Sequence, residues 1–356
     1  MNRLHHLKET LIENIRNNSN YQDAEFILLD YNSTDGLDDF IKTNLQEYLN
    51  SGRLVYYRTE TPKYFNRSHS RNLGFKLGSG DLICNIDADN FTGNGFATYL
   101  DQEFKKNGAC FLTAIGSQNV SQDVLGRICV RKDHFHELRG YDERMSWYGF
   151  EDHDFSNRLE KNATKKVPIS KEYLTALTHE QSERLSNERI SIDLVAIYIS
   201  YLTPASTDFL FLFKDGTCRK GILVNNDSFD YATPLTELKR SELKFKYSIY
   251  EDAWLTGIWT ANRQQINIKI GCKLSDTLQW KEKENCFVLK KDHSCQQFYH
   301  LTDPGLIEHA IMFFSQVSNR LIMAGNQLTG KIVVNDDFGQ DTVFKNFNNN
   351  DPVNVI

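Results

Sequence analysis

Apolar residues follow two different periods along the first half of the chain. Between residues 4 and 15 they recur every three or four positions, which predicts a helix with one apolar face. Residues 26–29 form a continuous apolar run, which is typical of a buried strand. The same alternation predicts a helix over 37–49, a strand over 54–57, a helix over 68–77 and a strand over 82–86. Alternating short elements of this kind are typical of an open α/β sheet covered by helices, which we expect over residues 1–195.

The pattern changes after about residue 200. Residues 209–213 and 221–224 have the character of two strands of a β-hairpin around a turn at 214–217. Further strands are expected at 243–250, 257–260 and 266–270, and a late helix at 305–323. We therefore expect a smaller β-rich domain of unknown role over residues 200–356, ending in a polar, loosely ordered tail at 337–351. Its large aromatic residues are expected in the core rather than on a carbohydrate-binding surface: Trp254, Trp259, Trp280 and Tyr299.

The composition narrows the class of protein. The 356 residues are 40% apolar and 25% charged, as in an ordinary globular protein large enough for two cores. The net charge is -6, and no dense basic run is interleaved with aromatic residues, so a nucleic-acid partner is not expected. There is no uninterrupted apolar stretch of about 18 residues, so we expect no transmembrane segment. A cytoplasmic location is expected, with peripheral association at the inner face of a membrane left open.

The seven cysteines are odd in number and lack CxxC spacing. Cys84, Cys110 and Cys129 lie within apolar, strand-like runs, where cysteine behaves as a small core residue. The sequence therefore indicates neither disulfides nor structural zinc.

Residues 147–159 contain a glycine-containing turn that is followed by an acidic helix start. Glu151, Asp152 and Asp154 fall in the first turn of an amphipathic helix. Acidic side chains there complement the helix dipole, which is one interpretation of this cluster. The other is a chemical role, in which a carboxylate binds a ligand or accepts a proton.

A second acidic pair, Asp87 and Asp89, follows the apolar strand expected over 82–86. Ligands of open α/β sheets bind at the carboxyl ends of the strands, and Asp30 lies at another such end. Two carboxylates spaced in this way suit a hard divalent ion such as Mg²⁺ or Mn²⁺. A solvated loop is the alternative interpretation of the pair.

Several segments together resemble a known family. Residues 30–36, 70–74 and 87–89 resemble, in order, the nucleotide-sugar signatures of family 2 glycosyltransferases with the GT-A fold. Segments 65–67, 140–143, 149–154 and 157–159 are similar to the matching segments of β-1,4-galactosyltransferases and related chondroitin-type polymerases. The resemblance covers roughly residues 1–190 and implies a GT-A domain that binds a UDP-sugar donor and a saccharide acceptor.

The resemblance implies a metal site and a donor site. Asp89 resembles the metal ligand of the acidic pair and His179 the histidine ligand of the same Mn²⁺ or Mg²⁺ ion, with Asp87 nearer the ribose or the second coordination sphere. Donor-binding roles are implied for Arg3, Asp30, Asn32, Arg67, Arg71 and Asp87.

Three of these assignments have specific alternatives. Arg67 and Arg71 resemble residues that face the diphosphate, with ordinary solvated arginines as the alternative. Asp30 resembles the acid that accepts a hydrogen bond from the uracil ring. Helix capping or loop stabilisation is its alternative, and that is expected more for Asp35 than for Asp30.

The resemblance also assigns the chemistry. Asp152 is implied as the base that deprotonates the acceptor hydroxyl, and Glu151 as the residue that orients the acceptor. Trp147 and Tyr148 would offer an aromatic face to the acceptor sugar, with a core role as the alternative. The family has a Trp-Gly-Gly run where this chain has Tyr148, Gly149 and Phe150.

We therefore expect an inverting, metal-dependent hexosyltransferase of glycan or polysaccharide biosynthesis, with galactose or N-acetylgalactosamine favoured as the transferred sugar. Transfer from UDP-glucose or UDP-N-acetylglucosamine is the alternative within the fold, and a non-catalytic glycan-binding or scaffolding relative is the alternative outside it. A nucleotidyltransferase is disfavoured because no Gly-rich phosphate loop opens the chain. The family's first buried strand is missing before Asn2 and Arg3. We expect translation to start further upstream, with a fold that has lost a central strand and part of its uracil pocket as the alternative.

Overall fold

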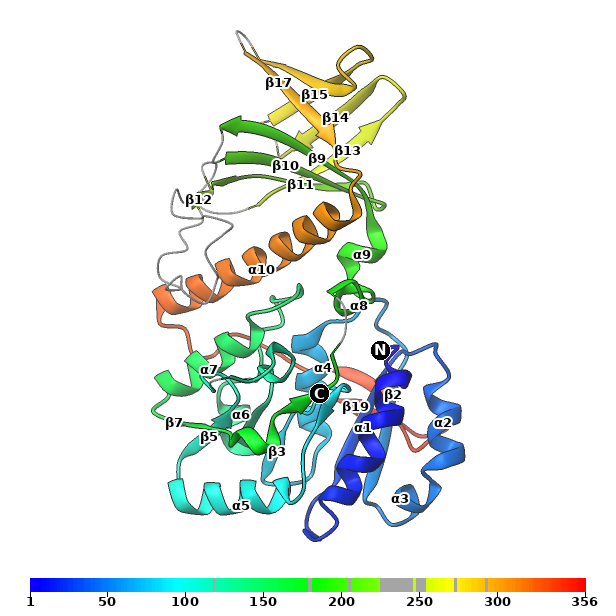
Figure 1. The fold of residues 1–356 in the computed structure, drawn as a ribbon, viewed down its shortest axis with the longest axis vertical. Coiled ribbons are helices and arrows are strands. Elements are labelled where there is room, and N and C mark those ends of the chain that lie inside the picture. The colour runs from blue at the N-terminus through cyan, green and yellow to red at the C-terminus, as the bar shows by residue number, and fades with distance from the viewer. Residues whose placement is uncertain are drawn as a thin grey trace. The chain divides into compact units, whose positions relative to one another are not determined.

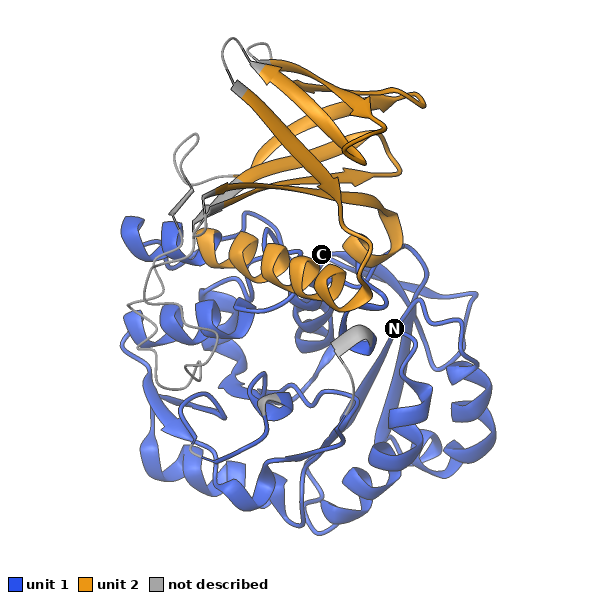
Figure 2. Cartoon of the chain, turned by 45° about the horizontal axis from the view of Figure 1, so that its top comes forward, with its two compact units in different colours: residues 1–188, 322–356 blue, residues 189–321 orange. Residues whose placement is uncertain are grey.

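The computed structural model describes residues 1–117, 119–178, 181–203, 206–224, 246–247, 254–271, 274–291 and 294–356. The chain divides into two compact units (Figure 2). Unit 1 contains Met1–Glu188 together with Ile322–Ile356, and unit 2 contains Arg189–Leu321. The first boundary lies close to the expected one, but the end of the chain belongs to unit 1, whereas we expected it in the second domain.

Unit 1 consists of helices and short strands (Figure 1). Its helices are α1 (Leu4–Asn17), α2 (Leu37–Asn44), α3 (Gln46–Asn50), α4 (Arg67–Leu77), α5 (Phe96–Asn107), α6 (Lys132–Glu137), α7 (Glu151–Lys161) and α8 (Gln181–Leu185), with the 3-10 helices η1 (Gln122–Val124) and η2 (Lys171–Tyr173). Its strands are β1 (Phe26–Tyr31), β2 (Leu54–Thr59), β3 (Leu82–Cys84), β4 (Asn90–Phe91), β5 (Cys110–Thr113), β6 (Ile128–Arg131), β7 (Lys165–Pro168), β8 (Thr175–Ala176), β18 (Asp341–Lys345) and β19 (Pro352–Val355).

The elements predicted up to residue 86 are confirmed, with two differences. The helix predicted over 37–49 is divided at Leu45 into α2 and α3, and the last predicted strand, β3, ends at Cys84. The α/β organisation expected for this part of the chain is therefore correct, and so is the β-rich region after it.

The strands of unit 1 form two mixed sheets and a small pair. The first sheet has the order β1-β2-β18-β19, and β1 runs parallel to β2, as the helical crossover through α2 and α3 requires. The second has the order β3-β6-β5-β7, in which β6 is antiparallel to both β3 and β5. β4 and β8 form a separate antiparallel pair, and β4 begins directly after the Asp87–Asp89 segment.

Apolar faces of the helices pack against these sheets. Leu7, Leu11 and Ile15 of α1 are buried in one cluster with Ile41 of α2 and Leu54 of β2. The same periodic positions predicted the apolar face of this helix, so burial of that face accounts for the position of α1.

The end of the chain is a strand pair in unit 1 rather than the loose polar tail expected at 337–351. β18 pairs antiparallel with β2, and Val343 is fully buried beside Val55 and Tyr57. The side chain of Asn346 accepts a hydrogen bond from the backbone N–H of Tyr56 at 3.0 Å. The polar composition predicted disorder, but an asparagine of this segment satisfies the backbone of a neighbouring strand that is distant in sequence.

Unit 2 is a closed antiparallel sheet with a helix at each end of its sequence. Its elements are α9 (Arg189–Asp193), β9 (Leu194–Thr203), β10 (Ser206–Phe213), β11 (Thr217–Val224), β12 (Lys246–Tyr247), β13 (Leu255–Ala261), β14 (Gln265–Ile270), β15 (Leu274–Lys281), β16 (Cys286–Lys291), β17 (Ser294–His300) and α10 (Pro304–Thr329). The strand order is β10-β9-β17-β16-β15-β14-β13-β11-β12, and pairing of β10 with β11 closes the sheet on itself.

The strand predictions for this region are largely confirmed. The hairpin corresponds to β10 and β11, the strands at 257–260 and 266–270 to β13 and β14, and the late helix to α10, which is longer than predicted and ends within unit 1. Of the strand predicted at 243–250, the structure describes only residues 246 and 247, which form β12.

The aromatic residues of unit 2 are mostly packed, as predicted. Trp259 and Trp280 pack against the apolar core of the closed sheet, and Trp254 lies 4.8 Å from Phe314 between ring centroids. Tyr299, by contrast, is 39% exposed.

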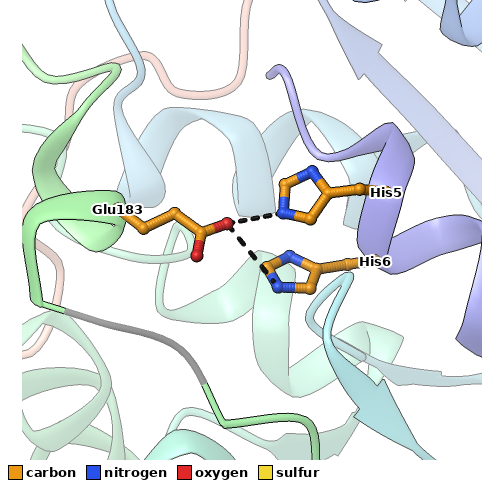
Figure 3. A group of neighbouring side chains, drawn as sticks. All are labelled: His5, His6 and Glu183. Carbon is orange, nitrogen blue, oxygen red and sulfur yellow. Dashed lines mark hydrogen bonds and ion pairs between the residues drawn. The ribbon is translucent and has the colours of Figure 1, made fainter.

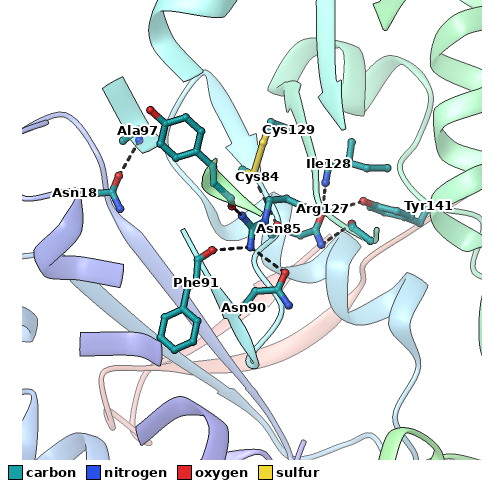
Figure 4. The surroundings of a disulfide bond; sticks show 12 residues. Asn18, Cys84, Asn85, Asn90, Phe91, Ala97, Arg127, Ile128, Cys129 and Tyr141 are labelled. Atoms are coloured by element: carbon teal, nitrogen blue, oxygen red, sulfur yellow. Dashed lines mark hydrogen bonds between the residues drawn. A yellow bond between two sulfur atoms is a disulfide. The ribbon is translucent and has the colours of Figure 1, made fainter. Parts of the chain in front are cut away.

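The structure corrects the expectation that the chain has no disulfide. Cys84 of β3 lies directly opposite Cys129 of β6, with 4.1 Å between their Cα atoms, and the two sulfur atoms are bonded (Figure 4). Spacing along the chain gave no indication of this pairing, because the two cysteines become neighbours only through the strand register. Cys110 remains a buried free thiol, as expected.

Within the described part of the chain, every helix is too short or too polar to cross a lipid bilayer.

Two valines that face each other across β18 and β19 provide a test of the placement of the C-terminal strands. Val343 is fully buried, whereas its cross-strand partner Val353 is 39% exposed. We expect Val343→Ala to lower the free energy of unfolding of unit 1 by about 2 kcal/mol, because it leaves a cavity in the core. Val353→Ala is the control and should cost less than about 0.5 kcal/mol. Calorimetric unfolding of both variants measures this, and equal losses would contradict the burial of β18.

Candidate active site

The guanidinium group of Arg71 joins two acidic segments that are far apart in the sequence. It lies on α4 and donates from Nη1 to Oε1 of Glu151 at 2.9 Å. Its Nη2 lies 3.4 and 3.5 Å from the two carboxylate oxygens of Asp87. Burial alone would lower the pKa of Arg71, but Asp87 and Glu151 raise it above the usual range, so this cation is always charged.

Gly126 has no side chain, and this leaves room for the contact between Arg71 and Asp87. A Cβ atom on Gly126 would lie 2.7 Å from Nη2 of Arg71 and 3.2 Å from Oδ2 of Asp87. Any larger side chain would therefore displace the cation from the acidic loop. No motif in the sequence marked this glycine as part of the site.

The Glu151–Asp152 pair opens α7, as the sequence predicted. Glu151 is buried, and its Oε2 accepts no hydrogen bond from the residues that the structure describes. Burial, followed by the adjacent Asp152 carboxylate, raises the pKa of Glu151 against the opposing charge of Arg71. The half-buried Asp152 accepts a hydrogen bond from the backbone N–H of His153 at 2.7 Å, and burial raises its pKa as well. Both carboxylates are therefore more basic than ordinary surface acids.

The turn before α7 has an unusual backbone. Gly149 has φ 87° and Phe150 has φ 70°, so both adopt the left-handed conformation that favours glycine. Phe150 is therefore strained at the position where the resembled family has a glycine. This turn directs the chain into α7 immediately before the two acidic residues.

The Asp87–Asp89 loop has one exposed and one buried carboxylate. The side chain of Asp87 is 39% exposed, whereas Asp89 is 9% exposed and accepts from Nδ2 of Asn90 at 2.8 Å. Oδ1 of that asparagine in turn accepts from Nη2 of Arg127 at 2.9 Å (Figure 4). Burial lowers the pKa of Arg127 to about 10, although Asp87 and Asp89 oppose this effect. Arg127 is a second buried cation beside the loop that the sequence did not reveal, because it stands outside every recognised motif.

The donor set of this loop suits a hard divalent ion. Asp87 and Asp89 both offer carboxylate oxygens, and Nδ2 of Asn90 donates a hydrogen bond to Asp89. Leu177 donates its backbone N–H to the carbonyl oxygen of Asp89 at 2.8 Å, so the chain leading to residue 179 is fixed next to the loop. His179, the other predicted ligand, lies outside the described residues.

Asp30 is already extensively hydrogen-bonded. Its Oδ1 accepts from the backbone N–H of Ser33 at 2.8 Å, and its Oδ2 accepts from Tyr56 at 2.6 Å and from Arg58 at 3.0 Å. Asp30 therefore stabilises the loop after β1, which is the alternative role considered for it. Asp35 has the capping role expected of it, because its Oδ2 accepts from the N–H of Leu4 at the start of α1, at 2.8 Å.

Arg3 and Asn32 contact different segments of the chain. Asn32 donates from Nδ2 to the carbonyl oxygen of Pro62 at 3.0 Å. Arg3 precedes α1 and donates to the carbonyl oxygen of Glu183 on α8, and its Nη1 lies 3.8 Å from the carboxylate of the same residue. Burial lowers the pKa of Arg3, and the charges that raise it again include Asp89.

Arg67 begins α4 and is held by several contacts. It forms an ion pair with the buried Glu188 and donates from Nη2 to the carbonyl oxygen of Arg184 at 3.1 Å. Its guanidinium lies 4.3 Å from the ring centroid of Tyr148. Tyr148 therefore contacts a cation of the predicted donor site, while Trp147 beside it is half-buried.

Two further motif residues are structural. Asp154 is buried and forms an ion pair with Nε of Arg158 at 2.7 Å within α7, so it is not an additional acid of the site. Asn72 donates to the carbonyl oxygen of Tyr141 at 2.9 Å and accepts its N–H at 2.7 Å, which joins α4 to the segment before α7. A Cβ on Gly140 would lie 2.3 Å from Oδ1 of Asn72.

The part of the chain that contains these residues is similar to known proteins. Residues 1–156 match the family model described as Glycosyl transferase family 2. No curated protein matches the chain. Solved structures that it resembles include a mutant of Drosophila β1,4-galactosyltransferase 7 in complex with manganese, UDP-Gal and xylobiose, at 17% identity and a TM-score of 0.32, over 45% of this chain and 74% of that chain. The catalytic domain of the same Drosophila enzyme with xylobiose matches at 18% identity and a TM-score of 0.32, over 45% of this chain and 73% of that chain.

Residues 1–156 therefore match glycosyl transferase family 2, which confirms the resemblance inferred from the sequence motifs over this part of the chain. The match supports glycosyl transfer as the activity of this region.

The strained turn before α7 gives a prediction about stability. Phe150→Gly and Phe150→Ala both remove the ring and differ only in a Cβ atom. Because φ is 70° at this position, we expect the glycine variant to be more stable than the alanine variant by about 1 kcal/mol. The exposed Gln102 within α5 is the control, where glycine should be less stable than alanine by about 1 kcal/mol. Urea unfolding of the four variants tests this, and the same order at both positions would contradict the strain.

Proposed function

We propose that this chain is an inverting, metal-dependent glycosyltransferase that moves galactose or N-acetylgalactosamine from a UDP donor to a saccharide acceptor in glycan or polysaccharide assembly. The observation that supports it best is the Arg71 bridge, which holds Glu151 at the start of α7 next to the Asp87 loop. A base for the acceptor and the acidic loop of the donor site are thereby adjacent. We propose a cytoplasmic reaction, with peripheral attachment to the inner face of a membrane as the alternative.

The departing diphosphate requires positive charge, because its negative charge grows as the glycosidic bond breaks. Arg67 and Arg71 lie on consecutive turns of α4, and a planar guanidinium can bind two phosphate oxygens at once. In the proposal Asp89, with Asp87 beside it and His179 as a further ligand, would hold Mn²⁺ or Mg²⁺. Such an ion would supply further positive charge to the diphosphate.

The remaining donor contacts are assigned from the same arrangement. Asp30 and Asn32 lie at and just after the carboxyl end of β1, where ligands of open α/β sheets bind. In the proposal Asp30 accepts from the uracil ring in addition to its present contacts, since each carboxylate oxygen can accept two hydrogen bonds. Arg3, whose pKa is lowered by burial and in part raised again by the negative charge of Asp89, is proposed as a further cation of the donor site.

Asp152 is proposed as the base. Its carboxylate takes the proton of the acceptor hydroxyl while the hydroxyl oxygen attacks the anomeric carbon and the diphosphate leaves from the opposite side. A single displacement of this kind inverts the anomeric centre. The raised pKa of Asp152 favours the reaction because a more basic carboxylate accepts the proton more readily.

Glu151 is proposed to orient the acceptor. One of its carboxylate oxygens is occupied by Arg71, and Oε2 is buried without a hydrogen-bond partner among the described residues. A second hydroxyl group of the acceptor sugar would satisfy this oxygen. Trp147 and Tyr148, immediately before the turn, would contact the apolar face of the same sugar.

Calorimetric binding of nucleotide sugars to the full chain tests the donor site. UDP, UDP-galactose, UDP-N-acetylgalactosamine, UDP-N-acetylglucosamine, UDP-glucose and GDP-mannose are titrated with Mn²⁺ and with EDTA. The proposal expects metal-dependent binding of UDP and of one UDP-sugar, and loss of the metal-dependent part in Asp89→Asn. The sugar that binds distinguishes galactose donors from UDP-glucose or UDP-N-acetylglucosamine. Binding of none of these nucleotides would reject the proposal in favour of a non-catalytic relative.

A pair of matched aspartates tests the base. Asp152 and Asp133 each occupy the second position of a helix and accept from the N–H of the following histidine at 2.7 Å. Asp152→Asn should retain donor binding and lose transfer by about a thousandfold, whereas Asp133→Asn, at an exposed position, should leave transfer unchanged. In the unmodified protein, kcat should fall with decreasing pH through a pKa above the ordinary value of about 3.9. Full activity of Asp152→Asn would rule out this residue as the base.

A further inference from the structure

Three ligand-type side chains converge at the start of α1, outside the residues assigned to the donor and acceptor. Nε2 of His5 lies 2.6 Å from Oε1 of Glu183, and Nε2 of His6 lies 3.6 Å from the same oxygen (Figure 3). One ligand atom from each residue lies within 4.8 Å of the others. Among the described residues, these two histidines and one carboxylate form a group that is compact enough to hold a metal ion.

The three residues come from two elements of unit 1. His5 and His6 belong to the first turn of α1, and Glu183 belongs to α8, near the end of the unit's first segment. The side chain of His6 is almost fully buried, whereas that of His5 is 61% exposed. One imidazole is therefore fixed by its surroundings, and the other can adjust and leaves the cluster open to ions from solution.

We propose that His5, His6 and Glu183 form a binding site for a divalent transition-metal ion, with Zn²⁺ as the best chemical fit. Zinc bonds to histidine nitrogen and carboxylate oxygen at about 2.0–2.2 Å in a tetrahedral arrangement, which places its ligand atoms about 3.3 Å apart. The distances of 2.6 and 3.6 Å to Glu183 bracket that separation, and the ligand atoms of the two imidazoles lie within 4.8 Å of each other, so shifts of about 1 Å would convert the cluster into three of the four ligands. A water molecule would be the fourth.

The ligand types of the cluster support this assignment. Glu183 offers a carboxylate oxygen, and His5 and His6 offer imidazole nitrogens. Imidazole nitrogen favours zinc over Mg²⁺ or Mn²⁺, which distinguishes this cluster from the oxygen ligands of Asp87 and Asp89. The Arg3 guanidinium, 3.8 Å from Glu183, weakens binding by repelling the ion, and it can retain its bond to the carbonyl oxygen of Glu183.

Metal binding at this position would fix α8 to α1. The Arg3 side chain lies at the same junction, because it donates a hydrogen bond to the carbonyl oxygen of Glu183 on α8. The site would therefore act as a clamp within unit 1. A hydrogen-bonded His5–Glu183 pair that binds no metal is the competing interpretation, and the experiment distinguishes the two.

Zinc titration of the full chain, stripped with EDTA and free of nucleotide, tests the proposal. We expect one Zn²⁺ to bind to the unmodified protein, and His5→Ala and Glu183→Gln each to weaken that binding by about tenfold or more. His309→Ala, which removes an exposed histidine on α10, is the matched control and should leave zinc affinity unchanged. Cobalt substituted at the site should give the visible absorption of a four-coordinate ion in the unmodified protein and lose it in His5→Ala.

Two results would overturn the proposal: no zinc binding by the unmodified protein, or equal affinity in His5→Ala and the unmodified protein. Because His5 is largely exposed, its replacement leaves the fold intact, and circular dichroism verifies this. The Asp89→Asn variant distinguishes zinc binding at this site from metal binding at the proposed donor site. It should retain zinc binding while losing metal-dependent UDP binding, so failure of either proposal is recognisable independently of the other.

Discussion

The candidate site depends on one buried cation. Arg71 projects from α4 between the Asp87 loop and Glu151 at the start of α7, and no other described contact joins both acids directly. Removing one partner of a buried ion pair leaves an uncompensated charge, which costs several kcal/mol. The side chain therefore positions a strand end and a helix start relative to each other, and Gly126 provides the space in which it does so.

Around this cation, unit 1 is organised by buried polar side chains as well as by apolar packing. Asn72 exchanges two hydrogen bonds with the backbone of Tyr141, and Arg158 donates from Nη2 to the carbonyl oxygen of Gly140 at 2.8 Å. These bonds secure the segment before α7, which has little regular structure of its own. Fully satisfied networks of this kind specify one arrangement of the chain, which a site assembled from several loops requires.

The sequence predicted much of the catalytic region because its signals are local. The period of apolar residues gave α1, β1, β2 and α4, and the Glu151–Asp152 pair was correctly placed in the first turn of a helix. Contacts made by residues distant in sequence were missed. Arg127 belongs to no motif, yet its guanidinium contacts Asn90 beside the acidic loop. The polar residues near the C-terminus suggested disorder, yet Asn346 bonds to the backbone of β2.

By itself, the sequence determined the class of fold and the similarity of residues 1–156 to glycosyl transferase family 2, because periodicity and short motifs depend on residues that are close together along the chain. The tertiary structure alone decided which residues from distant segments meet. The Cys84–Cys129 bond follows from the register of β3 with β6, and the assembly of His5, His6 and Glu183 follows from the approach of α8 to α1. Such contacts arise from the packing of whole elements, which no local pattern of residues encodes.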